Sequence, residues 1–475
     1  MKRLYIYGLT LCLGLSSCSD FLEKKPSTSL GTEDAITSVT DVRNAINGIS
    51  YLMSRNRMTY SADFAIISDL KGSDFYPISQ NNQAGPIGRY QITKNDDIPW
   101  YAYQYFYRAL ANVNSALSQI DAVPASSAAE QEELTDSKGQ LFAWRAMLHF
   151  DLARMFCTIP VIAEDVNAAN TGLVLSTEVY APDYLAPRTT LKETYDQIFS
   201  DFEVALSMLS KDKNNGRINY WAALAMKSRA HLWNGDNADA LEDAQEVIDN
   251  SGHKLYTIEE YPSVWGLTYT TESLFELTIT TSYNAQRNSV GYYCDATGYG
   301  ECGFVTGEGT LLDYLQKNPS DVRSQLVKDQ TDPENNKFTN KGYFPAKYPG
   351  RENNLYVNSP KIIRLSEVYL IAAEAALKTT TSDKGAEYYI NELRKNRIED
   401  YEPVASVTIE DILFERRVEL FAENGCAWDE WRNMKSVKNA NVKEEINYTD
   451  YRTIFPIPQE EMNRAPGILV QNPNY

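Results

Sequence analysis

Tyrosines crowd one stretch of the chain together with an arginine, and this combination of side chains can bind sugars. Tyr283, Tyr292, Tyr293 and Tyr299 lie close together in sequence, and Arg287 falls between the first two. A tyrosine ring has a flat apolar face that can stack on a sugar ring, while its hydroxyl and a guanidinium can hydrogen-bond to sugar hydroxyls. The same side chains could instead pack together and tie the segment to the rest of the protein. Both interpretations stay open, and we take all five residues as candidate ligand contacts.

Cys18 follows a short apolar segment, and this order predicts a lipid attachment site. Lys2 and Arg3 give the chain a positive start, and the apolar residues 4–15 are too few to span a bilayer comfortably. Leu15-Ser16-Ser17 then stands directly before the cysteine. The arrangement resembles the lipobox of bacterial lipoproteins, in which the cysteine thiol carries a diacylglycerol and the signal is cut just before it.

Lipidation implies an exported protein that is anchored to a membrane without spanning it. We expect residues 1–17 to be the signal peptide and residues 18–36 a polar tether that follows the lipid. Asp20 and Glu23 in this tether resemble the export tag that sends some lipoproteins to the cell surface, although they also fit a plain polar linker.

Cys294 and Cys302 are close enough in sequence to form a disulfide across a glycine-containing loop. Such a bond is permitted outside the cytoplasm. The chain has six cysteines and no Cys-x-x-Cys pair, so cysteine spacing predicts no zinc site. We expect neither a bound metal nor a cofactor.

No catalytic motif stands out. The three histidines are His149, His231 and His253, and the first two fall within helical patterns, where structural roles are commoner than catalysis. The chain contains no nucleophile–histidine–acid signature, glycine-rich phosphate loop or His-Glu-x-x-His motif. We therefore expect a binding protein rather than an enzyme. A surface glycosidase remains the alternative, because pairs of carboxylates cannot be singled out among 64 acidic residues.

Glu415, Glu419 and Glu423 lie four residues apart and would share one face of a helix. Like charges at this spacing repel by about 0.2–0.5 kcal/mol per pair, so something must compensate them. One reading is a carboxylate site for acid–base chemistry or a metal. We favour an internal ion network, with partners among Arg394, Arg397, Arg416 and Arg432.

The overall charge excludes one class of partner. The formal net charge is −19, and removal of Lys2 and Arg3 with the signal makes the mature chain still more acidic. An acidic surface repels a phosphate backbone, so we do not expect nucleic acid to bind.

Helical periodicity dominates three stretches of the chain. Apolar residues recur three or four apart through residues 100–156, 191–250 and 362–397, which indicates amphipathic helices. Asn234-Gly235-Asp236 breaks one of them, and alanines at helical spacing follow, as in a tetratricopeptide unit. We predict a mainly α-helical fold of stacked tetratricopeptide-like helix pairs.

The body, residues 37–475, is expected to form a single unit. Its helical core covers about 37–250 and 361–475. Between them, residues 251–360 lose the helical pattern and are rich in glycine, proline, asparagine and tyrosine. We interpret this stretch as an irregular, loop-rich subdomain with minor β structure that contributes to the ligand site.

Several motifs in the C-terminal quarter follow the lipobox in an order that is typical of one protein family. They are Arg364-Leu365-Ser366-Glu367-Val368-Tyr369-Leu370-Ile371-Ala372-Ala373-Glu374, Asn391-Glu392-Leu393-Arg394, Phe414-Glu415-Arg416-Arg417-Val418-Glu419-Leu420, Trp428-Asp429-Glu430-Trp431-Arg432, Phe455-Pro456-Ile457-Pro458 and Gln471-Asn472-Pro473. Together they resemble the SusD/RagB family of outer-membrane nutrient-binding lipoproteins.

The resemblance implies a place on the cell surface beside a SusC-like TonB-dependent transporter, over which the lipoprotein acts as a ligand-binding lid. It implies a glycan or oligosaccharide ligand and no catalysis, with peptide binding as the alternative known for a minority. A structural or adhesive scaffold is a third hypothesis.

A second loop-like stretch joins the candidate ligand site. It contains Asp74, Tyr76 and Arg89. The ligand surface of the SusD/RagB family draws on similar regions, and on that ground we add these three residues.

Overall fold

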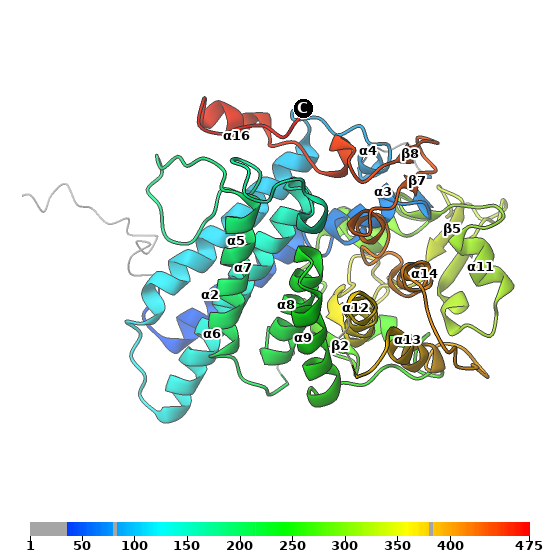
Figure 1. Ribbon diagram of the computed structural model, residues 1–475, viewed down its shortest axis with the longest axis horizontal. Coiled ribbons are helices and arrows are strands. Elements are labelled where there is room, and N and C mark those ends of the chain that lie inside the picture. Colours follow the sequence, from blue (N-terminus) through cyan, green and yellow to red (C-terminus); the bar gives the residue numbers. More distant parts are fainter. Residues whose placement is uncertain (1–35, 79–82, 214, 380–382) are drawn as a thin grey trace, which may run out of the picture.

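Long helices build most of the molecule. The computed structural model describes residues 36–78, 83–213, 215–379 and 383–475. Within these residues the chain is mainly helical and carries four two-stranded antiparallel sheets (Figure 1). The predicted fold class, stacked helix pairs with a loop-rich part that holds minor β structure, is confirmed.

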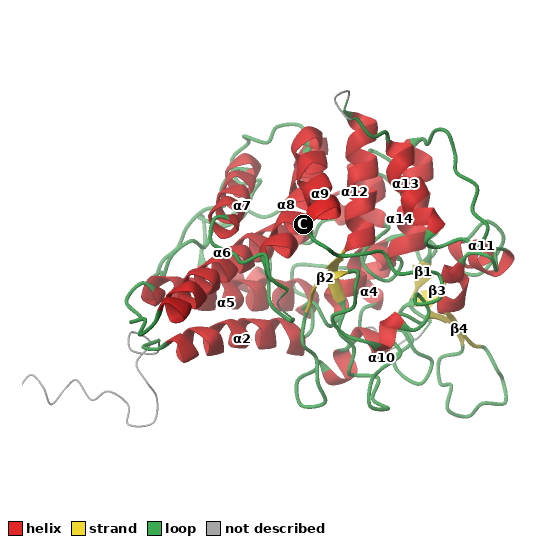
Figure 2. Cartoon of the chain, turned by 90° about the horizontal axis from the view of Figure 1, so that it is seen from below, coloured by secondary structure: helices red, strands yellow, loops and turns green. Residues whose placement is uncertain are grey.

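Neighbouring helices pack side by side. The longer helices are α2 (Val39–Arg55), α5 (Asp97–Ile120), α6 (Ala128–Phe156), α7 (Leu191–Leu206), α8 (Tyr220–Asn234), α9 (Asn237–Asn250), α12 (Leu365–Lys378), α13 (Ala386–Lys395) and α14 (Ile409–Leu420). Helix α6 packs against α5 and α7, α8 packs against α7 and α9, and α12 packs against α9 and α13. The stack therefore runs from the N-terminal helices across to the C-terminal ones, as Figure 2 shows from below.

Local sequence sets where these helices begin and end. Thr190 and Thr408 form capping boxes that begin α7 and α14. Gly235 ends α8 in the left-handed conformation at φ +91°, which glycine adopts without steric cost, and α9 begins two residues later. The predicted break at this point is therefore a tight turn between two packed helices.

Short elements make up the residues between α9 and α12. They are η5 (Val264–Gly266), β2 (Ser273–Glu276), η6 (Gln286–Asn288), α10 (Val290–Tyr293), β3 (Gly303–Phe304), α11 (Leu311–Lys317), η7 (Val322–Leu326), β4 (Val327–Gln330), β5 (Gly342–Pro345) and β6 (Lys361–Arg364). β4 pairs with β5, and β2 pairs with β6, so the first and last strands of this part lie together. In Figure 2 its loops gather on the side away from α9, α12 and α13.

The remaining short elements come before α7 or after α14 in the chain. They are η3 (Asp63–Ile66), α3 (Ile67–Lys71), β1 (Phe75–Tyr76), α4 (Gly85–Gly88), η4 (Pro160–Ile162), α15 (Ala427–Arg432), β7 (Val437–Lys438), β8 (Glu445–Ile446), η8 (Tyr451–Thr453) and α16 (Gln459–Arg464). β1 pairs with β3 through Phe75 and Phe304. Among the described residues, none of the helices combines the length and the apolar character needed to cross a bilayer.

Candidate ligand-binding surface

Tyr283 lies at the surface where the end of α2 meets the loop that follows β2. Its ring meets the ring of Tyr51 edge to face, with centroids 5.3 Å apart, and about half of the Tyr283 side chain is exposed. The guanidinium carbon of Arg55, one turn further along α2, lies 5.3 Å from the centroid of the Tyr51 ring, and the Arg55 Nη1 donates to the Tyr51 hydroxyl. Tyr51, Tyr283 and Arg55 thus present aromatic rings, a hydroxyl and a cation together.

A second aromatic cluster follows directly along the chain. Tyr292 packs edge to face against Tyr299, with centroids 4.9 Å apart, and against Tyr356, with centroids 5.4 Å apart. All three rings are half-buried, and the exposed Arg287 hydrogen-bonds to Tyr356, which raises the pKa of its guanidinium. Together with Tyr51, Arg55 and Tyr283 we call these residues the tyrosine face.

Backbone contacts hold the two clusters next to each other. The Val290 amide, at the start of α10, donates to the Ser61 carbonyl just beyond α2. Gly291 lets the turn around Leu355 come close, because a Cβ at this position would lie 2.5 Å from the Leu355 carbonyl oxygen. The amide of Tyr299 in turn donates to the Tyr292 carbonyl at 2.8 Å. Sequence reasoning missed Tyr51 and Tyr356, because each comes from a segment without a crowd of aromatic residues.

Two of the predicted ligand contacts lie in the interior. Tyr293 is fully buried, its hydroxyl lies 3.4 Å from an Asp63 oxygen, and burial raises the pKa of this phenol well above its usual range. Asp74 is buried as well and forms a two-pronged ion pair with Arg417, at 2.9 and 2.5 Å. Both side chains therefore use their polar atoms to join parts of the protein. Of the predicted contacts, Tyr283, Arg287, Tyr292 and Tyr299 belong to the tyrosine face.

Tyr76 and Arg89 are not part of the ring pairs that define the tyrosine face. Tyr76 is half-buried in β1, opposite Gly303 of β3. Arg89 follows α4, and its Nε donates to the Gln91 side chain at 3.1 Å. The Ile78 amide donates to the Gly300 carbonyl, so this stretch borders the tyrosine face without adding a described ring contact to it. Their role as ligand contacts stays a prediction.

Cys294 and Cys302 lie beneath this surface. Both are fully buried free thiols in the structure. The pKa of Cys302 is raised well above its usual range, mainly by burial and further by the neighbouring Cys294 thiol. The two thiols are thus neighbours, and a disulfide between them stays a prediction. Cys18 falls in residues 1–35, outside the described part of the chain.

The three glutamates at four-residue spacing form the predicted ion network. Glu415 accepts from Arg323 and Arg394, both at 2.6 Å. Glu419 accepts from Arg364 at 2.5 Å and from Arg397 at 3.0 Å. Burial by itself would raise the pKa of Glu419, but Arg397, Arg364 and Arg323 lower it well below its usual range. Glu415 and Glu419 are therefore each paired with more than one arginine, as the interpretation of an internal ion network requires.

Two of the four arginines suggested as partners of these glutamates are part of the network. Arg394 and Arg397 join the network, but Arg416 and Arg432 do not. The Nε of Arg416 lies 2.8 Å from Asp429, and Arg432 pairs with Asp429 and Glu374. The network instead uses arginines and a lysine from segments far away in sequence, namely Arg323, Arg364 and Lys347.

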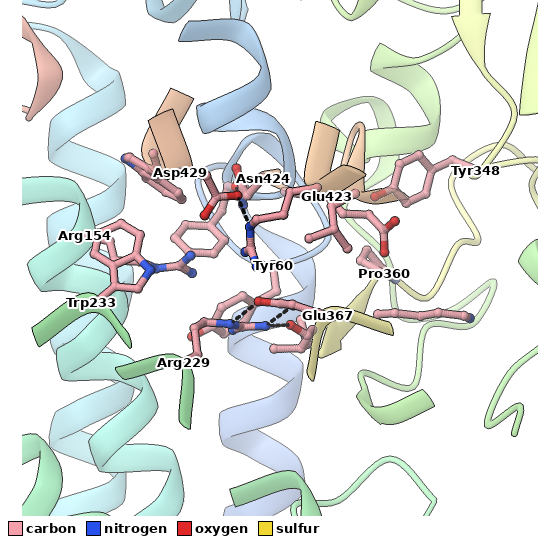
Figure 3. A pocket seen from close by; sticks show the side chains of 17 residues that line it. Tyr60, Arg154, Arg229, Trp233, Tyr348, Pro360, Glu367, Glu423, Asn424 and Asp429 are labelled. Atoms are coloured by element: carbon pink, nitrogen blue, oxygen red, sulfur yellow. Dashed lines mark hydrogen bonds and ion pairs between the residues drawn. The ribbon is translucent and has the colours of Figure 1, made fainter. Parts of the chain in front are cut away.

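An internal cavity lies where α8, α12 and α14 meet. Charged side chains surround it, and Figure 3 shows Arg229 against Glu367 on one side and Arg154 next to Trp233. Its volume is about 50 Å³. At about 10–15 Å³ for each water this is room for a few water molecules and too little for a sugar ring. This cavity is therefore not a candidate site for a glycan.

The histidines occupy structural positions. Burial, reinforced by Arg145, lowers the pKa of His149 to about 3, and the Ser176 amide donates to its Nε2. The His231 Nδ1 lies 3.3 Å from Asp236 at the turn between α8 and α9. With Asp239 these two residues form a described group whose ligand-type atoms lie within 4.8 Å of one another, a spacing that is also common among exposed acidic residues without a metal.

Comparison with known families identifies the chain. The sequence pattern described as the SusD family matches residues 211–475, which is more than half of the chain, and the pattern described as starch-binding associating with outer membrane matches residues 20–232. The chain belongs to the SusD family. The resemblance drawn from its motifs is thereby confirmed.

Individual SusD-family relatives match over the whole length. SusD-like protein P2 of Formosa agariphila is 24% identical, with all of both chains covered. A crystal structure of a SusD superfamily protein from Bacteroides thetaiotaomicron is 30% identical with a TM-score of 0.84, over 92% of this chain and all of that one. A laminarin-binding SusD-like protein is 20% identical with a TM-score of 0.74, over 93% of this chain and all of that one, and shares the fold.

Proposed function

We propose that this chain is a surface-exposed, lipid-anchored glycan receptor of the outer membrane, which captures an oligosaccharide and passes it to a SusC-like TonB-dependent transporter. The observation that carries the proposal is the tyrosine face, where exposed and half-exposed rings stand beside two arginines. Rings on a rigid support can stack on sugar rings at a low entropic cost. The starch-binding description of the matching family pattern, and the laminarin-binding structural neighbour, support the same class of ligand.

The carboxylates near the tyrosine face favour binding over hydrolysis. A glycosidase needs two carboxyl groups that face one substrate at about 5–9 Å. Asp63 is paired with Arg57 at 2.9 Å, and Asp295 with Lys328 at 2.8 Å. The buried Glu301 carboxylate accepts the backbone amides that begin α4, including that of Gly85 at 2.8 Å. These acids are held inside the protein by partners of their own.

The ligand site is tested by removing its rings. We expect Tyr283→Ala and Tyr292→Ala each to weaken glycan binding roughly two- to tenfold, because each removes a stacking face. Tyr184→Ala is the matched control, since Tyr184 is about as exposed as Tyr283 and lies in a different loop. Calorimetry of the soluble form against a glycan panel measures the affinities. Unchanged affinity in both site variants would reject the tyrosine face, and release of reducing ends would favour a glycosidase.

Anchoring and partnership are tested in the cell. We expect Cys18→Ser to appear in the soluble fraction, whereas the parent protein stays with the outer membrane, because the lipid supplies the attachment. Mass spectrometry of the mature N-terminus checks the acyl groups directly. A pull-down from detergent-solubilised membranes should return a TonB-dependent barrel. Recovery of a different protein would favour the scaffold hypothesis, and a bare Cys18 would remove the anchor.

A further inference from the structure

Three of the four segments that build the tyrosine face carry no acidic residue. Residues 42–62 supply Tyr51 and Arg55, residues 277–294 supply Tyr283, Arg287 and Tyr292, and residues 353–366 supply Tyr356. None of the three contains Asp or Glu, although the chain has 64 acids among its 475 residues. These three segments therefore add none of the carboxylates that give the chain its net charge of −19.

Three acidic residues flank Tyr299 and Tyr356 in sequence. Asp295 and Glu301, on either side of Tyr299, are buried and point to partners in the interior. Glu352 is exposed and precedes the turn that holds Tyr356, so it marks the edge of the acid-free region. Among the described residues, the charged side chains that contact the rings of the face are the cations Arg55 and Arg287.

Arg55 and Arg287 both contact tyrosines of the face. Both are exposed, and among the described residues both hydrogen-bond to tyrosine hydroxyls and form no ion pair with a carboxylate. Arg43, on the same helix as Arg55, shows the contrast, because its Nη2 lies 2.5 Å from Glu133. A phenol is neutral at physiological pH, so the charge of Arg55 and Arg287 is left without a local counter-charge.

We infer that the glycan bound by the tyrosine face is anionic, carrying carboxylate or sulfate groups, an inference that rests on the proposed function. A guanidinium binds such groups with charge-assisted hydrogen bonds, often two at a time, while a tyrosine ring stacks on the sugar itself. Arg55 and Arg287 stand at the two clusters of rings and bind acidic groups on separate sugar units. A neutral glycan would leave both charges unmatched.

The first test compares acidic and neutral ligands on the unmodified soluble protein. A panel of neutral polysaccharides and of polysaccharides with uronate or sulfate groups identifies the strongest ligand. We expect it to be acidic. Reduction of its carboxyl groups to alcohols, or removal of its sulfates, should weaken binding about tenfold or more, because each charged hydrogen bond is lost. Binding should also weaken as salt is raised.

The second test removes the arginines. We expect the double variant Arg55→Gln with Arg287→Gln to bind the acidic glycan about tenfold more weakly and to bind its neutralised form as the parent does. Arg43→Gln is the control and should behave as the parent, since Arg43 lies about three turns away on α2, roughly 18 Å along the helix.

The outcomes separate the two proposals. A neutral strongest ligand, equal binding of the acidic and neutralised glycans, or an unaffected double variant would overturn the anionic class and leave glycan capture standing. Failure of the parent protein to bind any glycan in the panel would overturn both. The comparison of ligands uses the parent protein alone, so it decides the matter even where a variant fails to fold.

Discussion

Lys71 is a buried lysine that forms no ion pair with a carboxylate of the described residues, and Asp450 offsets the cost of its burial only in part. Its ammonium lies 4.6 Å from the Phe455 ring centroid and 5.9 Å from that of Trp431, and it donates to the carbonyls of Arg452 and Thr453 at 3.1 and 2.9 Å. Ring faces and carbonyl oxygens stabilise a charge less well than water does. Burial accordingly lowers the pKa of Lys71 to about 7.

This pKa predicts how stability depends on pH. Between about pH 7 and 10.5 the unfolded chain holds a proton on Lys71 that the folded chain lacks, so the free energy of unfolding should rise with pH by up to about 1.4 kcal/mol per unit. Lys71→Met should flatten this rise, whereas Lys395→Met, at an exposed ion pair, should keep it. Urea unfolding at pH 7, 8 and 9 measures the slopes, and equal slopes in parent and Lys71→Met would contradict the assignment.

At the scale of elements, α10 and the loop after it carry two rings of the tyrosine face only because backbone segments come very close. Gly298 is the tightest point, since a Cβ there would lie 2.1 Å from the Tyr292 carbonyl oxygen. The loop returns along α10 at this residue, and Tyr299 then reaches Tyr292. The arrangement of Tyr292 and Tyr299 in the tyrosine face thus depends on a residue that has no side chain.

Gly298→Ala should therefore disturb the site without disturbing the helices. We expect glycan affinity to fall several-fold, because the loop must move away from Tyr292, while far-ultraviolet circular dichroism stays as in the parent. The control is Gly266→Ala, where a Cβ would find its nearest atom at 3.9 Å. Calorimetry gives the affinities. Full affinity in Gly298→Ala would show that the position of Tyr299 does not matter for binding.

At the scale of the whole molecule, the ion network around Glu419 ties the irregular part to the helical stack. Helix α14 supplies Glu415 and Glu419, Arg323 comes from η7, Arg364 from the end of β6, and Arg397 follows α13. All five side chains are buried. The network therefore joins elements that no single helix pair would bring together.

Removal of one charge from this network should be costly. Glu419→Gln leaves three buried guanidinium groups with less compensation, and we expect a loss of about 3–5 kcal/mol in the free energy of unfolding. Glu410 lies on the same helix α14 and forms an exposed ion pair with Lys435. We expect Glu410→Gln to lower the free energy of unfolding by about 1 kcal/mol or less. Chemical denaturation compares the two. Equal, small losses would mean that the network contributes little.

Short-range patterns in the sequence determined the helices and the family. Apolar spacing, capping residues such as Thr190, and the break at Gly235 act within a few residues, so they can be recognised before any fold is known. The spacing of Glu415, Glu419 and Glu423 predicted an ion network for the same reason, since it put three like charges on one helix face.

Only the tertiary structure decided which polar residues face solvent. Tyr292 and Tyr293 are neighbours in sequence, yet one ring joins the surface and the other is buried against Asp63. Asp74 pairs with Arg417, and Tyr51 packs against Tyr283, across more than 200 residues of sequence in each case. Exposure and ion pairing depend on contacts between distant segments, and local sequence carries no record of which segments will meet.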